Sequence, residues 1–542
     1  MHSGPTRRGL ALVAAMSLLA ACADRGPTAA PSNGRATPGP TATTLPAPTV
    51  LPSPTASVPA SFPLAVVTGL TNHRSVIELD SLASLASDGK LVVPCGIAIN
   101  QPALTTTASC IPANGIAAAI LADQQLIALL PPGLVEPATK VLPIAGDGPY
   151  GLFGPDLFGD SQSRALPYPV VGAPTGEPAL DPAWTAYDVS QVWTMTAVGS
   201  LCADRGGARQ AVTLGKGWDY IFDGGTAKYK GPPIPNPNPP PGIDLHPIVR
   251  PVETGNDGLT SSLSKRADVA LAAHKCPIQT DDAWIPPPGR AGNFAVPEAV
   301  LSRWQDFLGI DAVYLPADHQ SDRGVAGIRS TLRLLDKYGI AHTGLGLTLD
   351  RALEPAIVTV GGRKVAFVAW DEVPGPVHAG ATTAGVAWLN RANIKAATDR
   401  ARAAGADVIV CDPIWWNGTE YALAIWPRML RQVGWFDTYG CDQVIGAGLH
   451  LAGPVLLGKL STGGSRFVLS TSGNYLFGQD FWQLTQEGVI LEEKFVGTRL
   501  VNVRLHPYVM INAARPALLD PEGDGHYVLD RIWKISDLDY QP

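Results

Sequence analysis

The stretch LPADHQSDRGVAGIRSTLRLLDKYGIAHTGLG, residues 315–346, has the pattern of a loop at a strand end followed by a helix. The apolar run DAVYL at 311–315 predicts a buried strand, and the residues after the loop recur at helical spacing. Asp318, His319 and Asp322 lie in the loop. Carboxylates and imidazoles at a strand end are candidate ligands or acid–base groups, so this loop is the first candidate for chemistry.

Strands and helices alternate on both sides of this loop. Apolar runs rich in β-branched residues predict strands at 193–200, 267–271, 365–370, 406–411 and 442–446. Helical spacing predicts helices in NIKAATDRARAAG (393–405) and TEYALAIWPRMLRQVGW (419–435). Apolar strands separated by helices indicate sheets that are covered by helices. In such folds, ligands bind beyond the carboxyl ends of the strands.

Two folded domains are expected. Residues 62–188 predict a small α/β domain, with helices at 77–87 and 115–130, and its pattern weakly resembles one lobe of a periplasmic solute-binding protein. Residues 189–542 form the larger β/α series. It contains a Pro-rich insertion at about 217–262, which we expect to be an irregular surface arm, because proline excludes helix and central strand.

The N-terminal end predicts export. Residues 1–22 combine Arg7 and Arg8 with a short apolar run, which is typical of a signal peptide. The run ends in Leu-Ala-Ala-Cys, which resembles a bacterial lipobox and implies lipid attachment at Cys22. An ordinary signal peptide with an incidental cysteine is the alternative. Residues 23–61, rich in Pro and Thr, predict an extended linker, so the expected place is extracytoplasmic, lipid-anchored to the cell membrane.

Charge and cysteine content limit the classes of partner and the compartment that we expect for this chain. The net charge is −7 and there is no basic cluster, so the sequence lacks the patch of positive charge that nucleic-acid binding requires. Besides Cys22 there are six cysteines, at positions 95, 110, 202, 276, 411 and 441. An even number in an exported chain predicts disulfides. Cys95 and Cys110 are close enough in sequence to join one loop, and the pairing of the other four is left open.

Several motifs, in order, resemble the CapA family, which includes the poly-γ-glutamate capsule synthesis protein. The match within 315–346 runs over His319, Asp322, Gly324, Thr331, Leu332, Gly339, Ile340, Gly344 and Gly346. ARAAGADVIVCDPIWWNGTEY, GCDQVIGAGLH and LSTSGNYLFGQDFW resemble later motifs, and the resemblance spans about residues 190–510. It implies a calcineurin-like metallophosphoesterase fold, a four-layer α/β/β/α sandwich, preceded here by the smaller α/β domain. It also implies a role in cell-surface polymer or capsule (poly-γ-glutamate) biosynthesis.

The resemblance also implies a two-metal site, and here most of its ligand positions are replaced. Ser200 stands where the first strand should end in Asp, and Lys275 stands for a carboxylate. The segment around Trp415 lacks the expected His. Asp318, His319 and His450 remain, enough for one sparse divalent site (manganese, zinc, iron or magnesium) or for none.

The remaining candidate residues have alternatives that the sequence leaves open. His319 and Asp322 are the candidate catalytic pair, and Asp322 is alternatively the N-cap of the following helix. Asn474, Trp415 and Trp416 are candidate substrate-binding residues, although tryptophans at a seam between layers are as common.

We therefore expect a weak or non-catalytic member with a binding or scaffold role beside the capsule synthesis machinery. The alternatives are an active mono-metal hydrolase of phosphoesters or surface amide polymers, and a solute-binding lipoprotein.

Overall fold

The computed structural model describes residues 60–101, 104, 109–145, 169–176, 180–186, 188–234, 248–256, 258–286, 293–461, 464–480 and 482–540. The predicted signal peptide, Cys22 and nearly all of the predicted linker lie outside these ranges. Within them, no helix has both the length and the apolar character required to cross a membrane.

The first described part, from Phe62 to Thr185, is built on a five-stranded sheet in the order β6-β4-β7-β2-β8. Two smaller sheets, β1-β10-β5 and β3-β9, complete this part. The strands of all three sheets are β1 (Phe62–Pro63), β2 (Ala65–Gly69), β3 (Ile77–Glu78), β4 (Leu91–Pro94), β5 (Ile97–Ile99), β6 (Ser109–Ile111), β7 (Ile127–Leu130), β8 (Thr139–Val141), β9 (Ile144–Ala145) and β10 (Val171–Pro174). Its helices are α1 (Ser81–Ser87), α2 (Ile116–Ala122) and α4 (Pro182–Thr185).

The helix predicted over 115–130 is wrong in its second half. Helix α2 ends at Ala122, a turn follows, and 127–130 form the buried strand β7. The apolar run was ambiguous because a short buried strand and a buried helix segment look alike in sequence. The helix predicted over 77–87 likewise begins only at Ser81, after the short strand β3.

The first sheet of the larger part follows the order β13-β12-β30-β29-β28-β11-β14-β17-β18, with β27 paired to β11. Its strands are β11 (Val192–Cys202), β12 (Thr226–Ile234), β13 (Ile248–Gly255), β14 (Val269–His274), β17 (Ala312–Tyr314), β18 (Ala341–Thr343), β27 (Asn474–Phe477), β28 (Glu487–Val496), β29 (Arg499–Ile511) and β30 (Arg515–Leu519). The helices of this half of the larger part are α5 (Gly206–Ala208), α6 (Leu259–Lys265), α7 (Ala299–Arg303), α8 (Gly324–Tyr338) and α12 (Gln483–Gln486).

The second sheet follows the order β20-β21-β23-β24-β26-β25-β31. Its strands are β20 (Ala356–Val360), β21 (Arg363–Asp371), β23 (Val408–Ile414), β24 (Gln443–Ile445), β25 (Val455–Lys459), β26 (Ser465–Leu469) and β31 (Asp537–Tyr540). The helices of this half are α9 (Leu349–Ala352), α10 (Arg391–Ala403), α11 (Pro427–Thr438) and α13 (His526–Lys534). Two short ribbons complete the fold: β15 (Ile278–Gln279) with β16 (Val296–Pro297), and β19 (Leu345–Gly346) with β22 (Gly385–Val386).

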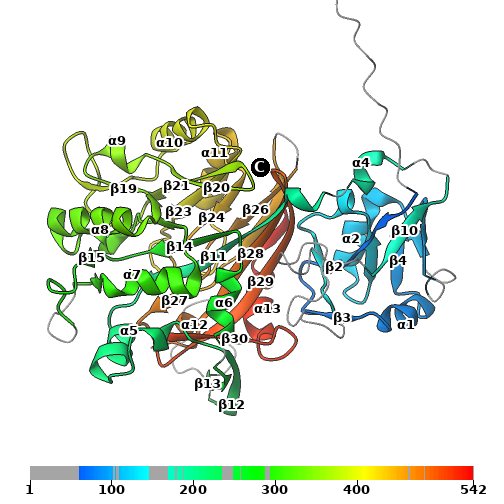
Figure 1. The fold of residues 1–542 in the computed structure, drawn as a ribbon, viewed down its shortest axis with the longest axis horizontal. Coiled ribbons are helices and arrows are strands. Elements are labelled where there is room, and N and C mark those ends of the chain that lie inside the picture. Colours follow the sequence, from blue (N-terminus) through cyan, green and yellow to red (C-terminus); the bar gives the residue numbers. More distant parts are fainter. Residues whose placement is uncertain are drawn as a thin grey trace, which may run out of the picture. The chain divides into compact units, whose positions relative to one another are not determined.

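Alternating side chains define four layers. Along β14, Val269 and Leu271 enter the core between the two sheets, whereas Ala270 faces the cluster that contains Leu334 of α8. Along β21, Phe367 likewise enters the core between the sheets, and the alternate residues pack on α10 and α11. Figure 1 shows α6, α7 and α8 grouped against β11 and β14, with α10 and α11 against β21 and β23. The predicted α/β/β/α sandwich is confirmed.

Two predictions inside the sandwich are corrected. The Pro-rich insertion at 217–262 is not irregular throughout, since β12 and β13 pair within it and lengthen the first sheet at its edge. Proline is tolerated here because β13 is the edge strand and β12 pairs with β30 only at Thr226 and Ala227, before its prolines. The helix predicted over 419–435 begins only at Pro427, which occupies the first turn, where the missing N–H costs nothing.

Candidate functional site

The polar residues of interest gather where strands of both sheets reach their carboxyl ends. Strands β11, β14 and β17 run parallel, as do β21, β23 and β24. The end or following loop of these strands carries Ser200 (β11), Lys275 (β14), Asp318 (β17), Asp371 (β21) and His450 (β24). The topology therefore gathers these side chains at the carboxyl ends of the strands.

A close backbone approach places Ser200 beside Asn474. The Ser200 N–H donates to the Gly473 carbonyl over 2.9 Å, and Ser200 pairs with Asn474 between β11 and β27. A Cβ atom at Gly199 would lie 2.2 Å from that same carbonyl oxygen, so only glycine fits there. The Ser200 hydroxyl is buried and has no hydrogen-bond partner among the described residues.

Lys275 occupies the interior of this cluster. Its side chain is 1% exposed, and its Nζ donates to the Gly448 carbonyl over 3.2 Å. Burial raises the pKa of Asp371 well above its usual range, and nearby Asp318 raises it further, while the Lys275 charge opposes this shift. The lysine is thus the cation that these buried carboxyl groups share.

His319 bridges two carboxylates. Its Nε2 lies 3.2 Å from Asp318 Oδ2, and its Nδ1 lies 3.1 Å from Asp322 Oδ2. Asp322 also accepts a hydrogen bond from the Phe294 N–H over 2.7 Å. Helix α8 begins at Gly324 without a side-chain cap, so the capping alternative for Asp322 is wrong and its contact with His319 is the one formed.

His450 joins Asn474 to Glu420. Its Nδ1 lies 2.7 Å from Asn474 Oδ1, and its Nε2 lies 3.5 Å from Glu420 Oε2. Burial and the Lys275 charge lower the pKa of His450, whereas its contacts with Glu420 and Asn474 raise it. Burial by itself would raise the pKa of Glu420, but His450, Lys275 and His319 together lower it to about 2.

Glu420 and Asp371 were not predicted as site residues. Asp371 ends the predicted strand VAFVAW, so the rule that pointed to Asp318 could have found it. Glu420 lies in a turn before α11, at the end of the stretch 401–421 whose resemblance was carried by other residues. Only the fold brings it to His450.

The two tryptophans take different places. Trp415 is fully buried and packs against Trp426 and Phe436 in the core beneath α11, so it offers no surface to a ligand. Trp416 is partly buried, and its backbone N–H donates to Glu372 Oε1 over 2.9 Å. Asn474 is buried, with its amide donating to the Thr485 carbonyl over 3.1 Å.

The donor set does not fit two metal ions. Within the described ranges, no group of three or more His, Cys, Asp or Glu side chains is placed to hold one ion. Of the candidate oxygens, Asp318 Oδ1 is buried without a hydrogen-bond partner in the described structure. The Lys275 ammonium has no lone pair to offer, and its charge opposes a second cation.

Disulfides link Cys95 to Cys110, Cys202 to Cys276, and Cys411 to Cys441. The first is the pair that sequence proximity suggested. The second joins the ends of β11 and β14, and Cys276 follows Lys275 directly, so this bond holds the backbone that carries the lysine.

Residues 252–479 match the profile of the family described as bacterial capsule synthesis protein PGA_cap. The chain matches no curated protein. Among solved structures it is similar to the NAD nucleotidase NadN of Haemophilus influenzae, with 14% identity, a TM-score of 0.32 and coverage of 65% of this chain and 57% of that one. It is similar to a 5'-nucleotidase precursor from Thermus thermophilus, with 14% identity, a TM-score of 0.32 and coverage of 63% and 58%. The chain thus spans less than two thirds of either structure.

Proposed function

Because residues 252–479 match the profile of the bacterial capsule synthesis family, we propose that this chain serves the synthesis of a bacterial surface polymer as a binding or scaffold protein. In this proposal it does not act as a two-metal hydrolase. Its place is outside the cytoplasm, attached to the cell membrane through a lipid on Cys22, and its partners are the enzymes or products of polymer synthesis.

Lys275 is the observation that carries the proposal. Divalent ions in sites of this type balance several carboxylates and activate a water molecule. Here a buried ammonium favours the charged form of Glu420, and burial favours the neutral form of Asp371. An ammonium supplies the charge but neither polarises water nor coordinates phosphate oxygens as a metal does, so the cluster keeps its electrostatic balance while losing metal chemistry.

Cysteine pairing supports the proposed location. All six cysteines in the described ranges form disulfides. Disulfides persist in oxidising compartments and are rare in the reducing cytosol. Palmitate labelling of the protein in cells, compared with a Cys22→Ser variant, tests the anchor directly, and equal labelling of the two would contradict it.

Metal content tests the loss of metal chemistry. The full chain is purified without chelators, offered manganese, zinc, iron and magnesium in turn, desalted and measured by mass spectrometry. We expect a metal content near zero for the wild type and a measurable gain for Lys275→Glu, which adds a carboxylate and removes the opposing charge. Lys395→Glu, on the exposed face of α10, is the matched control. A stoichiometry near one in the wild type, lost in His319→Ala, would support the hydrolase instead.

Surface polymer measured in cells tests the role. Deletion of the gene is expected to lower the amount of polymer, and a copy carrying both His319→Ala and His450→Ala is expected to restore it. Both side chains lie where catalysis would require them, but a scaffold needs only the fold. If the double variant is folded and present at the normal level yet fails to restore polymer, the non-catalytic proposal is wrong.

A further inference from the structure

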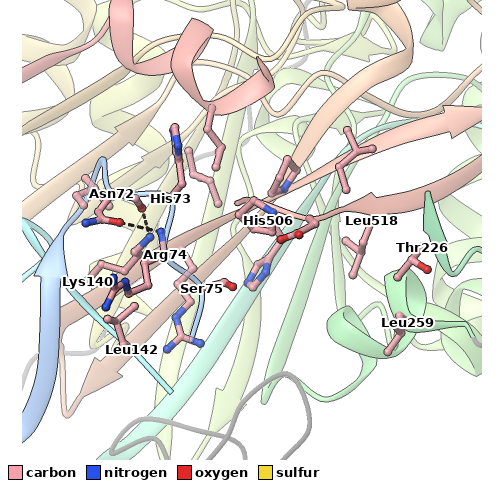
Figure 2. A pocket seen from close by; sticks show the side chains of 18 of the residues that line it. Asn72, His73, Arg74, Ser75, Lys140, Leu142, Thr226, Leu259, His506 and Leu518 are labelled. Carbon is pink, nitrogen blue, oxygen red and sulfur yellow. Dashed lines mark hydrogen bonds between the residues drawn. The ribbon is translucent and has the colours of Figure 1, made fainter. Parts of the chain in front are cut away.

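A cavity of about 390 Å³ lies away from the strand-end site, between the first part of the fold and the first sheet. Residues 70–75 and strand β8 form one wall, and strands β12, β29 and β30 with helix α13 form the other. Figure 2 shows Arg74 and Lys140 on one side of the cavity, with Thr226, Leu259 and Leu518 on the other. Cavities of this size at a junction between structural units are typical of small-molecule sites.

The walls are held together, so the cavity is built rather than incidental. Ser75 donates to Glu522 through both its N–H and its hydroxyl, over 2.9 and 3.0 Å. The Arg504 guanidinium donates to the Val141 carbonyl over 2.6 Å, and the Val141 N–H donates to Asn502 over 2.9 Å. These bonds cross from one wall to the other.

The lining combines an apolar body with an excess of positive charge. Leucines dominate the apolar part: Leu70, Leu142, Leu505, Leu518, Leu519 and Leu529. Four cationic side chains line the cavity, namely Arg74, Lys140, Lys228 and Arg504, against one carboxylate, that of Asp520.

Two carboxylates adjoin the lining: Glu522, which accepts both hydrogen bonds of Ser75 and favours the charged form of Lys140, and Glu492. Buried Glu492 would have a raised pKa from burial alone, but Lys494, His506 and Arg504 hold its pKa well below the usual range. Its charge is therefore taken up by Lys494 at 2.9 Å and His506 at 2.5 Å. The described structure gives the Arg74 guanidinium no hydrogen-bond or ion-pair partner.

We propose that this cavity binds a small organic anion, with one carboxylate or phosphate group held by Arg74 and Lys140 and an apolar body against the leucines. The Trp533 indole N–H, which is buried in the lining without a partner among the described residues, is a further donor for that ligand. A polyanion is a poorer fit, since most of the lining is apolar and would desolvate further charges without pairing them. The proposal does not rest on the function assigned to the strand-end site.

The position of Lys140 predicts that anion binding is accompanied by proton uptake. Its ammonium donates to the Asn72 carbonyl, and burial together with the Arg504 charge lowers its pKa to about 7, against the opposing charge of Glu522. An anion beside it favours the charged form, so binding at pH 8 should take up protons from solution. The affinity should accordingly rise as the pH falls from 8 to 6.

The test uses octanoate and octyl phosphate as probes, with octanol and octylammonium as matched uncharged and cationic controls, in titration calorimetry on the full chain. Octanoate or octyl phosphate is expected to bind, and Arg74→Gln and Lys140→Met are each expected to weaken binding about tenfold or more. Arg351→Gln, an exposed arginine paired with Glu354, should leave it unchanged. The tighter of the two anions identifies the head group as carboxylate or phosphate.

Calorimetry of the wild type in buffers of different ionisation enthalpy measures the number of protons taken up on binding, and this measurement needs no variant. Binding of neither anion would overturn the proposal, as would octanol binding as tightly as the anions. Equal affinity in the wild type and in folded Arg74→Gln would also overturn it.

Discussion

Replacing Lys275 with methionine tests whether the lysine is the countercharge of the strand-end cluster. Methionine keeps most of the length and the apolar stem but removes the ammonium that Glu420 and Asp371 share. The side chain is 1% exposed, so water cannot substitute for the lost charge without opening the site. The Gly448 carbonyl also loses its donor.

The size of the effect follows from burial. Removing one partner from a buried charge cluster leaves uncompensated charge, which typically costs about 3–5 kcal/mol of unfolding free energy. The loss should depend on pH. Without Lys275 the folded-state pKa of Glu420, now about 2, rises, so the folded variant takes up a proton at a higher pH than the wild type does. The difference between variant and wild type therefore shrinks as the pH falls below about 5.

Urea unfolding at pH 8 and pH 3, followed by tryptophan fluorescence with the disulfides intact, measures both the size and the pH dependence. Lys395→Met, at an exposed ion pair on α10, is the control and should change stability by less than about 1 kcal/mol. The countercharge role is refuted if Lys275→Met costs no more than this control, or if its cost is the same at both pH values.

Three further predictions concern the frame around the site. Burial raises the pKa of Glu493 from 4.5 to about 8, so the folded state keeps a proton that the unfolded chain releases, and stability falls as the pH rises through this window. Glu493→Gln should therefore gain about 3 kcal/mol at pH 7 and little at pH 4, measured by urea unfolding; no gain at pH 7 would contradict the buried acid. Gly199→Ala should prevent soluble expression or lower the melting temperature strongly, because its Cβ would meet the Gly473 carbonyl at 2.2 Å; a wild-type melting temperature would show that the two strands are not so close. Replacing Cys202 and Cys276 together by serine should cost about 4 kcal/mol for a loop of 74 residues, and unchanged stability would mean that the bond does not form.

Sequence periodicity was enough to predict most of the sandwich but not its borders. The strands at 193–200 and 365–370 are found within β11 and β21, because long apolar runs between helices leave little choice of structure. The boundary of α11 failed, since the apolar residues before Pro427 also fit helical spacing. The strands β12 and β13 were missed because prolines argue against a central strand. Here β13 is the edge strand, and β12 pairs with β30 only at Thr226 and Ala227, before its prolines.

The site was predictable only where a strand end carried it. Asp318 and His319 follow β17 directly, and the structure pairs them, as their spacing allows. Glu420 could not be found this way, because its contact with His450 spans a turn, a helix and a strand of the second sheet. The choice between capping and pairing for Asp322 depended on Phe294, a residue distant in sequence.

Lys275 also affects the balance of charge at the point where several carboxyl groups lie close together. Asp318 and Lys275 both act on the ionisation of Asp371, and Lys275 also acts on that of Glu420, so these acids would repel one another if all were charged. Two features of the fold reduce this repulsion. Burial favours the neutral form of Asp371, and the lysine favours the charged form of Glu420. A metal ion would therefore have to displace the ammonium from a position that is closed to solvent and fixed through Cys276. We therefore predict that a substitution of Lys275 that lowers stability also raises the metal content of the purified protein.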